Sequence, residues 1–600
     1  MADERFNPLI VQSDRTVLLE VDNPRFEAAR DCLARFAELE KSPEHVHTYR
    51  ITPLSIWNAA AAGLTADEIL QSLTSFSKYP LPAALVTEIK EYASRYGRLV
   101  LRPADPAATG SENPGRIYLE SSDPYLIEEI WRNDRIRRHL TGRTAQGYLE
   151  LLPLERGRIK QGLIKLGFPV VDRVGYVPGA PLPIRLRDCT RAGKPFALRP
   201  YQQDAVRAFL APASTAIPNV AATNEANADA NSDSPIHGSC EQTASYDGGS
   251  GVVVLPCGAG KTMVGLAVMA HLSCETLILA TSTAAVHQWI REIFDKTDLS
   301  PDEVGEYTGE EKHIKPVTVA TYQILTHRKR KGGDFPHFAL FNQKDWGLVI
   351  YDEVHLLPAE VFRITAEIQS RRRLGLTATL VREDKREDDV FTLIGPKRYD
   401  VPWKTLEQQG WIATAQCTEV RVELPESLRW DYAVAESREQ FRLAATNPAK
   451  LPVVEALVRK VHAGESILVI GHFLDQLETI AGRLGSPLIT GQTGSRRREQ
   501  LYDAFRRGDE PVLVVSRVAN FSLDLPEASV AIQVSGTFGS RQEEAQRLGR
   551  ILRPKASGRP ASFYTLVTRE TQEQSFALRR QLFLTEQGYR YHIADGDEIQ

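Results

Sequence analysis

Short apolar runs of four or five residues alternate with helix-length segments from about residue 250 to the carboxyl end of the chain. This alternation is typical of βαβ units, in which helices cover both faces of a parallel sheet. The runs form two sets, separated by a longer segment without such runs. The sequence therefore predicts an α/β fold with two parallel-sheet domains in tandem. The predicted strands are 252–255, 276–280, 317–320, 348–351 and 374–377 in the first set, and 467–470, 512–516, 530–534 and 563–567 in the second.

The amino-terminal third lacks a sustained set of apolar runs. Helix-like stretches at 25–40, 66–77 and 85–96 predict a helical accessory domain over residues 1–96. Residues 97–195 mix short alternating pieces with Pro and Gly, which predicts a small mixed domain. The parallel-sheet domains then occupy 196–405 and 406–600. Residues 211–250 are rich in Ala, Asn, Ser, Asp and Gly without a periodic apolar stripe, so we predict a disordered insertion there.

Composition limits the class of protein. The 600-residue chain has a formal net charge of −4, so its overall charge indicates no polyanionic partner, and any nucleic-acid surface must be a local patch. Its 6 cysteines are scattered, without a Cys-x-x-Cys pair or a zinc spacing, which favours a reducing compartment. No apolar run reaches the roughly 18 residues of a membrane span. We therefore expect a cytoplasmic protein without a membrane partner.

A glycine-rich turn follows the first predicted strand and precedes an apolar helix. Backbone N–H groups of such a turn, together with the helix dipole, bind phosphate oxygens. In this interpretation Lys261 neutralises charge on the β- and γ-phosphates of a nucleotide, and Thr262 ligates Mg²⁺. The alternative is a glycine turn that follows a strand by chance. The residues of the turn are Pro256, Cys257, Gly258, Ala259, Gly260, Lys261 and Thr262.

Two adjacent acids, Asp352 and Glu353, end another predicted strand. Ligands bind at the carboxyl ends of the strands in open parallel sheets. Asp352 is placed to hold Mg²⁺ directly or through water, and Glu353 to orient or deprotonate the water that attacks ATP. The acidic pair considered alone is equally compatible with a solvated turn. In combination with Lys261 and Thr262, the pair predicts ATP hydrolysis with ATP and Mg²⁺ as cofactors.

A third element, residues 546–553, lies in the second parallel-sheet domain. Its arginines Arg550 and Arg553 are candidates for arginine fingers, which reach across a domain cleft to a transferring phosphoryl group. Their spacing alone equally fits a basic, solvated helix face. The two-domain arrangement favours the catalytic role, because it gives the arginines a target.

These elements together resemble the superfamily 2 helicases, and specifically the XPB family of DNA helicases and translocases, which includes the helicase of transcription factor IIH. The resemblance implies two RecA-like P-loop domains. It extends over most of the chain. The matching segments are the adenine-reading Q motif at 196–202, the P-loop at 255–262, the DExH box at 352–355, motif III at 375–379, motif V at 520–526 and motif VI at 546–553. It implies that Gln202 reads adenine and that His355 belongs to the catalytic box.

The same resemblance implies contacts with DNA. It assigns Thr281, Ser282 and Thr321 to loops that touch the DNA backbone, and residues 382–384 to the site of strand separation. It places a DNA-gripping thumb at 424–446 and a damage-recognition-like domain at 97–195, the latter by position alone. The basic clusters 327–331 and 371–373 either add phosphate contacts or lie in solvated loops. The triplet at 382–384 is Arg382, Glu383 and Asp384.

The sequence thus predicts an ATP- and Mg²⁺-dependent motor whose two lobes close on ATP and step along DNA. The resemblance implies 3′ to 5′ polarity, duplex or forked DNA as the substrate, and work in repair or transcription beside a repair nuclease or the transcription machinery. Two alternatives stay open at this point. One is a DExH helicase acting on RNA, and the other is a double-strand translocase that remodels assemblies without unwinding.

Overall fold

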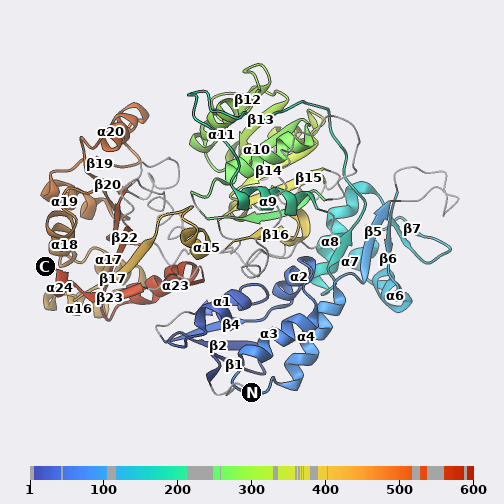
Figure 1. The fold of residues 1–600 in the computed structure, drawn as a ribbon, viewed down its shortest axis with the longest axis horizontal. Coiled ribbons are helices and arrows are strands. Elements are labelled where there is room, and N and C mark those ends of the chain that lie inside the picture. Colours follow the sequence, from blue (N-terminus) through green and yellow to red (C-terminus); the bar gives the residue numbers. More distant parts are fainter. Residues whose placement is uncertain are drawn as a thin grey trace, which may run out of the picture.

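A computed structural model gives the fold of the chain and contains four β-sheets (Figure 1). The predicted strand-separation triplet 382–384, motif V, the arginines Arg550 and Arg553, Cys257 and most of the predicted insertion lie outside the described residues. The structure describes residues 6–41, 45–103, 116–211, 248–256, 258–328, 336–358, 361, 365, 368, 371–378, 389–401, 403–516, 528–536, 560–586, 589 and 591–599.

The amino-terminal domain combines helices with a sheet. Its antiparallel sheet has the order β1-β2-β4-β3, so the prediction of a helical domain over 1–96 was wrong. The sequence does not predict these strands because they are only three to five residues long, and β3 lies where the sequence predicts the end of a helix. The elements are β1 (Leu9–Val11), β2 (Thr16–Glu20), α1 (Phe26–Leu33), β3 (Glu38–Lys41), β4 (Val46–Arg50), α2 (Pro53–Ala61), α3 (Ala66–Phe76) and α4 (Ala83–Arg95).

The described residues of the second domain form a mixed five-stranded sheet with the order β7-β8-β6-β5-β9, together with the α-helices α6, α7 and α8. Its core is aliphatic and includes Leu99, Leu119, Ile159 and Leu163, all fully buried. A small mixed domain in this region is what the sequence predicts. The elements are β5 (Leu99–Pro103), β6 (Ile117–Glu120), α6 (Pro124–Arg132), α7 (Asp134–Arg137), β7 (Gly142–Arg143), β8 (Leu149–Leu151), α8 (Arg156–Lys165) and β9 (Val170–Asp172).

Lobe 1 contains a seven-stranded parallel sheet with the order β12-β13-β11-β14-β15-β10-β16. All five strands predicted for this lobe lie in it. The two missed strands, β12 and β16, are the sheet edges, and they carry Glu, Lys, Arg and Asp in place of an apolar run. The elements are α9 (Pro200–Leu210), β10 (Ser250–Val254), α10 (Lys261–Leu272), β11 (Thr276–Ala280), α11 (Thr283–Lys296), β12 (Val304–Tyr307), β13 (Val317–Thr321), α12 (Tyr322–Thr326), β14 (Leu348–Asp352), η5 (Val354–Leu356), β15 (Arg372–Thr377), η6 (Val390–Ile394) and β16 (Lys397–Asp400).

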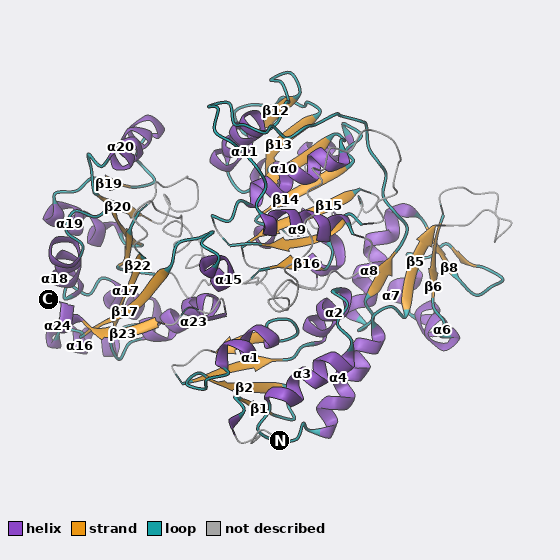
Figure 2. Ribbon diagram, viewed as in Figure 1, coloured by secondary structure: helices purple, strands orange, loops and turns teal. Residues whose placement is uncertain are grey.

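Lobe 2 contains a second seven-stranded parallel sheet, with the order β19-β20-β18-β21-β22-β17-β23. Helices lie against the sheets of both lobes (Figure 2), so the predicted tandem α/β architecture is confirmed. The elements are α15 (Trp403–Gln408), which connects the lobes, β17 (Ala415–Val422), α18 (Lys450–Ala456), β18 (Ile467–Gly471), α19 (Leu474–Leu484), β19 (Leu488–Ile489), α20 (Ser495–Arg507), β20 (Val512–Ser516), β21 (Val530–Gln533), β22 (Ala561–Thr568), α23 (Gln572–Glu586), β23 (Tyr591–Asp595) and α24 (Gly596–Ile599).

Two helices occupy the segment predicted as a thumb. They are α16 (Glu426–Val434) and α17 (Ser437–Ala445), and they pack against each other. No residue of α16 is buried, and Trp430 is 75% exposed. The segment is therefore helical, as the sequence predicts, and presents an aromatic side chain to solvent.

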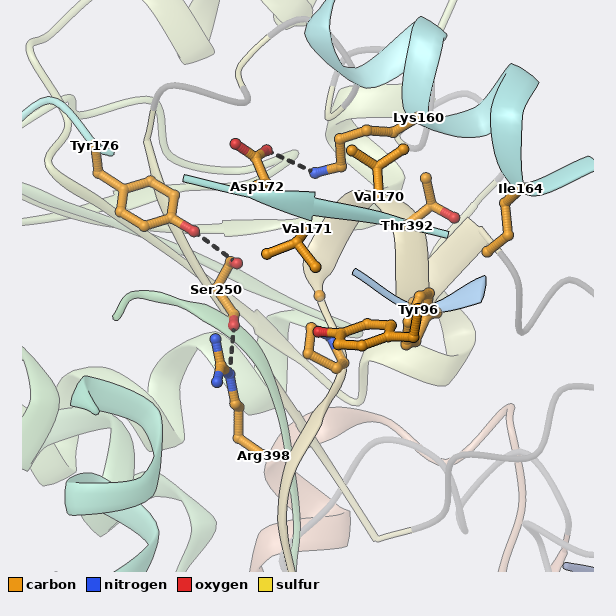
Figure 3. A pocket seen from close by; sticks show the side chains of 13 residues that line it. Tyr96, Lys160, Ile164, Val170, Val171, Asp172, Tyr176, Ser250, Thr392 and Arg398 are labelled. Atoms are coloured by element: carbon orange, nitrogen blue, oxygen red, sulfur yellow. Dashed lines mark hydrogen bonds and ion pairs between the residues drawn. The ribbon is translucent and has the colours of Figure 1, made fainter. Parts of the chain in front are cut away.

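A cluster of polar side chains lies at the boundary between the second domain and lobe 1. Asp172 of β9 accepts hydrogen bonds from Arg156 (2.8 Å) and Lys160 (3.1 Å) of α8. Beside them, Tyr176 donates to Ser250 Oγ across the domain boundary at 2.7 Å. Lys160, Asp172, Tyr176 and Ser250 lie around one cavity (Figure 3). Because Ser250 begins β10, the second domain is attached to the strand that leads into the glycine-rich turn.

No described helix is both long and apolar enough to cross a membrane.

Candidate active site

Three neighbouring strands of lobe 1 bring the predicted site together. Strands β14, β15 and β10 are adjacent and parallel, so their carboxyl ends meet at one edge of the sheet. The backbone N–H of Leu255, just after β10, donates to the carbonyl of Thr377 at the end of β15 at 3.0 Å. The glycine-rich turn, the acidic pair and motif III therefore lie side by side, as expected for a ligand site at this edge.

The glycine-rich turn has the backbone of an anion-binding loop. Gly258 and Gly260 take φ of +80° and +78°, a region that side chains disfavour. Ala259 N donates to the Pro256 carbonyl at 3.1 Å, and α10 begins at Lys261. The backbone N–H groups of the turn and the positive end of the α10 dipole thus lie together, an arrangement that suits the phosphates of a nucleotide.

Gln202 on α9 is tied to this turn. Its Nε2 donates to the carbonyl of Ala259 at 2.8 Å, and its Oε1 accepts from the Arg199 backbone N–H at 2.9 Å. Tyr201 OH donates to the same Ala259 carbonyl at 2.8 Å. A Cβ on Gly260 would lie 2.6 Å from Gln202 Nε2, so glycine is required there for α9 to approach. Gln202 supports the turn from behind, and its reading of adenine stays a prediction.

We expect Gln202→Ala to raise the KM for ATP about 5- to 50-fold, because it leaves the buried Ala259 carbonyl with fewer partners and loosens the turn. Steady-state ATPase kinetics measure this effect. The matched control is Gln203→Ala, since Gln203 is exposed and bonds only within its own segment, to the Leu198 carbonyl. A KM that moves equally in both variants would contradict a specific role for Gln202.

The acidic pair is held from several sides. Glu353 Oε1 lies 3.4 Å from Lys261 Nζ, and its Oε2 lies 3.4 Å from His355 Nδ1. Asp352 Oδ2 accepts from Trp289 Nε1 at 3.0 Å. Glu353 takes φ of +49°, which is unusual for a residue with a side chain and fixes its direction at the strand end.

The two carboxyl groups differ in their ionisation. Burial and, to a smaller extent, the charge of Glu353 together raise the pKa of Asp352 to about 6. Burial also opposes ionisation of Glu353, but the nearby Lys261 and His355 outweigh it and lower the pKa of Glu353. Glu353 is therefore ionised at neutral pH, the state that a water-activating base requires.

The donor set fits a hard divalent cation. Lys261 stabilises the negative charge of Glu353 more than that of Asp352, whose pKa stays raised. The carboxylate of Asp352 can therefore gain stabilisation from a bound cation. The hydroxyl of Thr262, one residue after Lys261, supplies a second oxygen at the same sheet edge. Oxygen donors of this kind suit Mg²⁺, which keeps several waters and shares the phosphates of its nucleotide.

His355 connects the acidic pair with motif III. Its Nδ1 lies 2.7 Å from Thr377 Oγ1 of β15, and the side chain is only 4% exposed. The sequence predicts a catalytic residue at this position. In this structure His355 contacts Glu353 and Thr377, which supports a positioning role, and a direct catalytic role stays a prediction.

Comparison with known proteins identifies the family. The sequence model of the ERCC3/RAD25/XPB C-terminal helicase matches residues 406–598, that of the type III restriction enzyme res subunit matches 195–382, and a helicase conserved C-terminal domain matches 9–145. A protein named DNA 3′-5′ helicase XPB from Kineococcus radiotolerans is 52% identical over 592 residues, 99% of this chain and 97% of the relative. The chain belongs to the XPB family of DNA helicases. A protein of the same name from Mycobacterium tuberculosis is 51% identical over 99% of this chain and 98% of its own length. The Saccharomyces cerevisiae general transcription and DNA repair factor IIH helicase/translocase subunit XPB/SSL2 is 30% identical, over 98% of this chain and 72% of its length.

Two of the three hydroxyls predicted to face DNA in this XPB-family chain, those of Ser282 and Thr321, serve as helix caps. Ser282 accepts from Ala285 N at 3.2 Å at the start of α11, next to the half-buried Thr281. Thr321 accepts from Ile324 N at 3.3 Å at the start of α12 and is 3% exposed. In this conformation the Thr321 side chain does not reach the surface, so a direct phosphate contact by its hydroxyl is not supported.

Two residues of these motifs gain roles that the sequence did not reveal. Trp289 binds the Asp352 carboxylate, and Tyr322 OH donates to the Asp352 carbonyl at 2.9 Å. Both contacts span long stretches of sequence, so no local pattern signals them. The basic cluster 371–373 fits neither earlier alternative, because Arg373 is fully buried on β15 and donates to the Leu393 carbonyl at 2.7 Å.

Proposed function

We propose that this chain is an ATP- and Mg²⁺-dependent DNA helicase or translocase of the DExH type that moves 3′ to 5′. The observation that carries the proposal is the approach of Glu353 to Lys261 at 3.4 Å, at the edge where the glycine-rich turn ends. This contact supports the proposal, because it brings a cation suited to phosphate next to an ionised carboxylate suited to activate water. The names of the bacterial relatives support DNA as the substrate and 3′ to 5′ as the polarity.

The chain's own residues divide the work of hydrolysis. The turn around Gly258 and Gly260 binds the phosphates, and Lys261 balances their charge. Glu353 orients the attacking water and accepts its proton, while His355 keeps Glu353 in place against β15. Mg²⁺ held by Thr262 and Asp352 would screen the negative charge of the β- and γ-phosphates. Arg550 and Arg553 are proposed to complete the site from lobe 2 when the lobes close.

A second candidate function is movement along duplex DNA without strand separation. The yeast relative is named a helicase/translocase subunit of a general transcription and DNA repair factor. This name supports translocation as a candidate function beside strand separation. By the same likeness we propose that the chain works with transcription or repair proteins, including a repair nuclease. Because its bacterial relatives act on DNA, we place it in the cytoplasm.

The test is the steady-state ATPase rate measured side by side without nucleic acid and with duplex DNA, single-stranded DNA and RNA. Salt concentration is held constant, because phosphate contacts weaken steeply with salt. We expect stimulation by DNA and not by RNA. A preference for duplex over single strands would favour the translocase, and stimulation by RNA alone would overturn the substrate while leaving the hydrolytic site in place.

A further inference from the structure

A groove with a volume of about 470 Å³ lies between α7 and α8 of the second domain. Its floor forms where Gly162 of α8 packs closely against Ile136 of α7, since a Cβ on Gly162 would lie 3.4 Å from Ile136 Cγ1. Figure 1 shows α7 and α8 on the side of the second domain that faces lobe 1. No lining residue of this groove belongs to the motor motifs that the structure describes.

The walls of the groove are cationic. Among the described residues that line it are Arg135, Arg138, Arg158 and Lys165, and no lining residue is an Asp or Glu. Arg135, Arg138 and Lys165 are exposed, so their charges face solvent. In a chain of formal net charge −4, such a concentration of positive side chains on one concave surface is a local exception that favours a polyanionic ligand.

Neighbouring carboxylates do not cancel this charge. Asp134 lies at the exposed start of α7. Glu155 divides its oxygens between His139 Nδ1, at 2.6 Å, and Arg158 Nη1, at 3.0 Å. Arg138 is oriented by donation from its Nε to the Arg135 carbonyl at 3.1 Å. The groove therefore keeps a surplus of cations, part of it already positioned.

The lining offers charge but little surface for stacking on bases. No Phe, Tyr or Trp lines the groove, and the ring of His139 is engaged by Glu155. Base recognition in flexible or opened nucleic acid relies on aromatic platforms, whereas contacts to phosphate carry no sequence information. We propose that the α7–α8 groove binds the phosphodiester backbone of DNA, without regard to base sequence or base damage.

The groove adjoins the motor at a defined contact. Gln161, which lines it, donates from Nε2 to Asp389 Oδ1 of lobe 1 at 2.8 Å, and α8 packs beside η6. Asp389 is where the described chain resumes shortly after the predicted strand-separation triplet at 382–384. A DNA backbone in the groove thus lies next to lobe 1, which suits a second point of attachment for a DNA motor. This inference rests on the proposed function.

The test compares a triple variant, Arg135→Gln with Arg138→Gln and Lys165→Gln, with a control of equal charge change. The control combines Lys90→Gln, Arg98→Gln and Arg132→Gln, all exposed residues of the first two domains outside the groove. Fluorescence anisotropy measures the affinity for duplex DNA without nucleotide at several salt concentrations. We expect the groove variant to bind about 10- to 100-fold more weakly and to lower the salt slope by about 2 to 3, because each phosphate contact contributes about 0.9.

Three further measurements make the outcome decisive. The melting temperature and the ATPase rate without DNA should match wild type, since none of the three residues belongs to the hydrolytic site. The loss should be equal on intact and on lesion-containing duplexes; a loss confined to lesions would overturn backbone binding in favour of lesion reading. Affinity equal to that of the control variant would also overturn the proposal, as would complete competition by polyglutamate, which would indicate a site for acidic proteins.

Failure of the groove and failure of the proposed motor give different results. A wild-type chain whose ATPase ignores DNA, but whose duplex affinity falls in the groove variant, would contradict the motor and leave the groove. A DNA-stimulated ATPase together with unchanged affinity in the variant would contradict the groove alone.

Discussion

Glu353→Gln is expected to leave ATP binding within about twofold of wild type and to lower the rate of ATP hydrolysis by about 10²- to 10⁴-fold, the usual contribution of a positioned general base. The amide keeps the shape of the side chain and its place at the end of β14. It cannot accept the proton of the attacking water. The charge that Lys261 and His355 now stabilise is also lost, so the defect belongs to the chemical step.

The measurements are single-turnover hydrolysis and the affinity for a fluorescent ATP analogue. Glu310→Gln serves as the control, because Glu310 is an exposed carboxylate of the same lobe and its substitution removes the same charge. A variant that turns over ATP at the wild-type rate would show that Glu353 is not the base. Equal loss of binding and turnover would instead indicate a damaged phosphate site.

Asp172→Asn is expected to destabilise the packing of α8 on β9 within the second domain by about 3–5 kcal/mol, the typical effect of removing one partner from a buried ion pair. Asp172 receives both Arg156, at 2.7 Å through Nη2, and Lys160, at 3.1 Å. The side chains of the two cations are 2% and 8% exposed, so water cannot replace the lost carboxylate. Desolvation already lowers the pKa of Lys160 to about 8, which shows how little of its charge is compensated.

Hydrogen exchange resolved by peptide is the suitable measurement, since a chain of several domains does not unfold in one step. Amides of α8 and β9 should lose protection, while those of lobe 2 should not change. Asp67→Asn provides the control, because Asp67 is 90% exposed and lies 3.9 Å from Lys90, where an ion pair contributes little. Unchanged protection in α8 would mean that apolar packing alone holds α8 against β9.

Uninterrupted apolar runs made the strands of the two lobes predictable, whereas strands with polar residues or fewer residues could not be predicted. Strands such as β11 and β20 are uniformly apolar because both faces of a parallel sheet are covered. By contrast, β17 alternates polar and apolar residues, and β23 carries His and Asp, so neither has the composition of a buried strand. The amino-terminal sheet was missed for the same reason, since its strands are short and partly exposed.

Local sequence predicted which residues form the site, but not how distant residues support them. The contact of Lys261 with Glu353 follows from two recognisable strand ends in one parallel sheet. The contact of Trp289 with Asp352 depends on the packing of α11 across the sheet, which no spacing in the sequence encodes. Arg373 shows a different kind of error. A basic triplet in the sequence suggests a solvated segment, but in the fold Arg373 is buried and donates a hydrogen bond to the backbone carbonyl of Leu393.

The two hydrogen bonds to Asp352 have a thermodynamic consequence. Trp289 and Tyr322 lie on α11 and α12, whose first turns begin at Ser282 and Thr321, in the loops expected to meet the DNA backbone. Any shift of these helices on DNA must therefore alter the surroundings of the acid that is to hold Mg²⁺. Linkage is reciprocal, so nucleotide binding would change the affinity for DNA by the same factor that DNA changes the affinity for nucleotide. The hydrogen bonds from Trp289 and Tyr322 to Asp352 would in this way couple the binding of DNA to the binding of nucleotide.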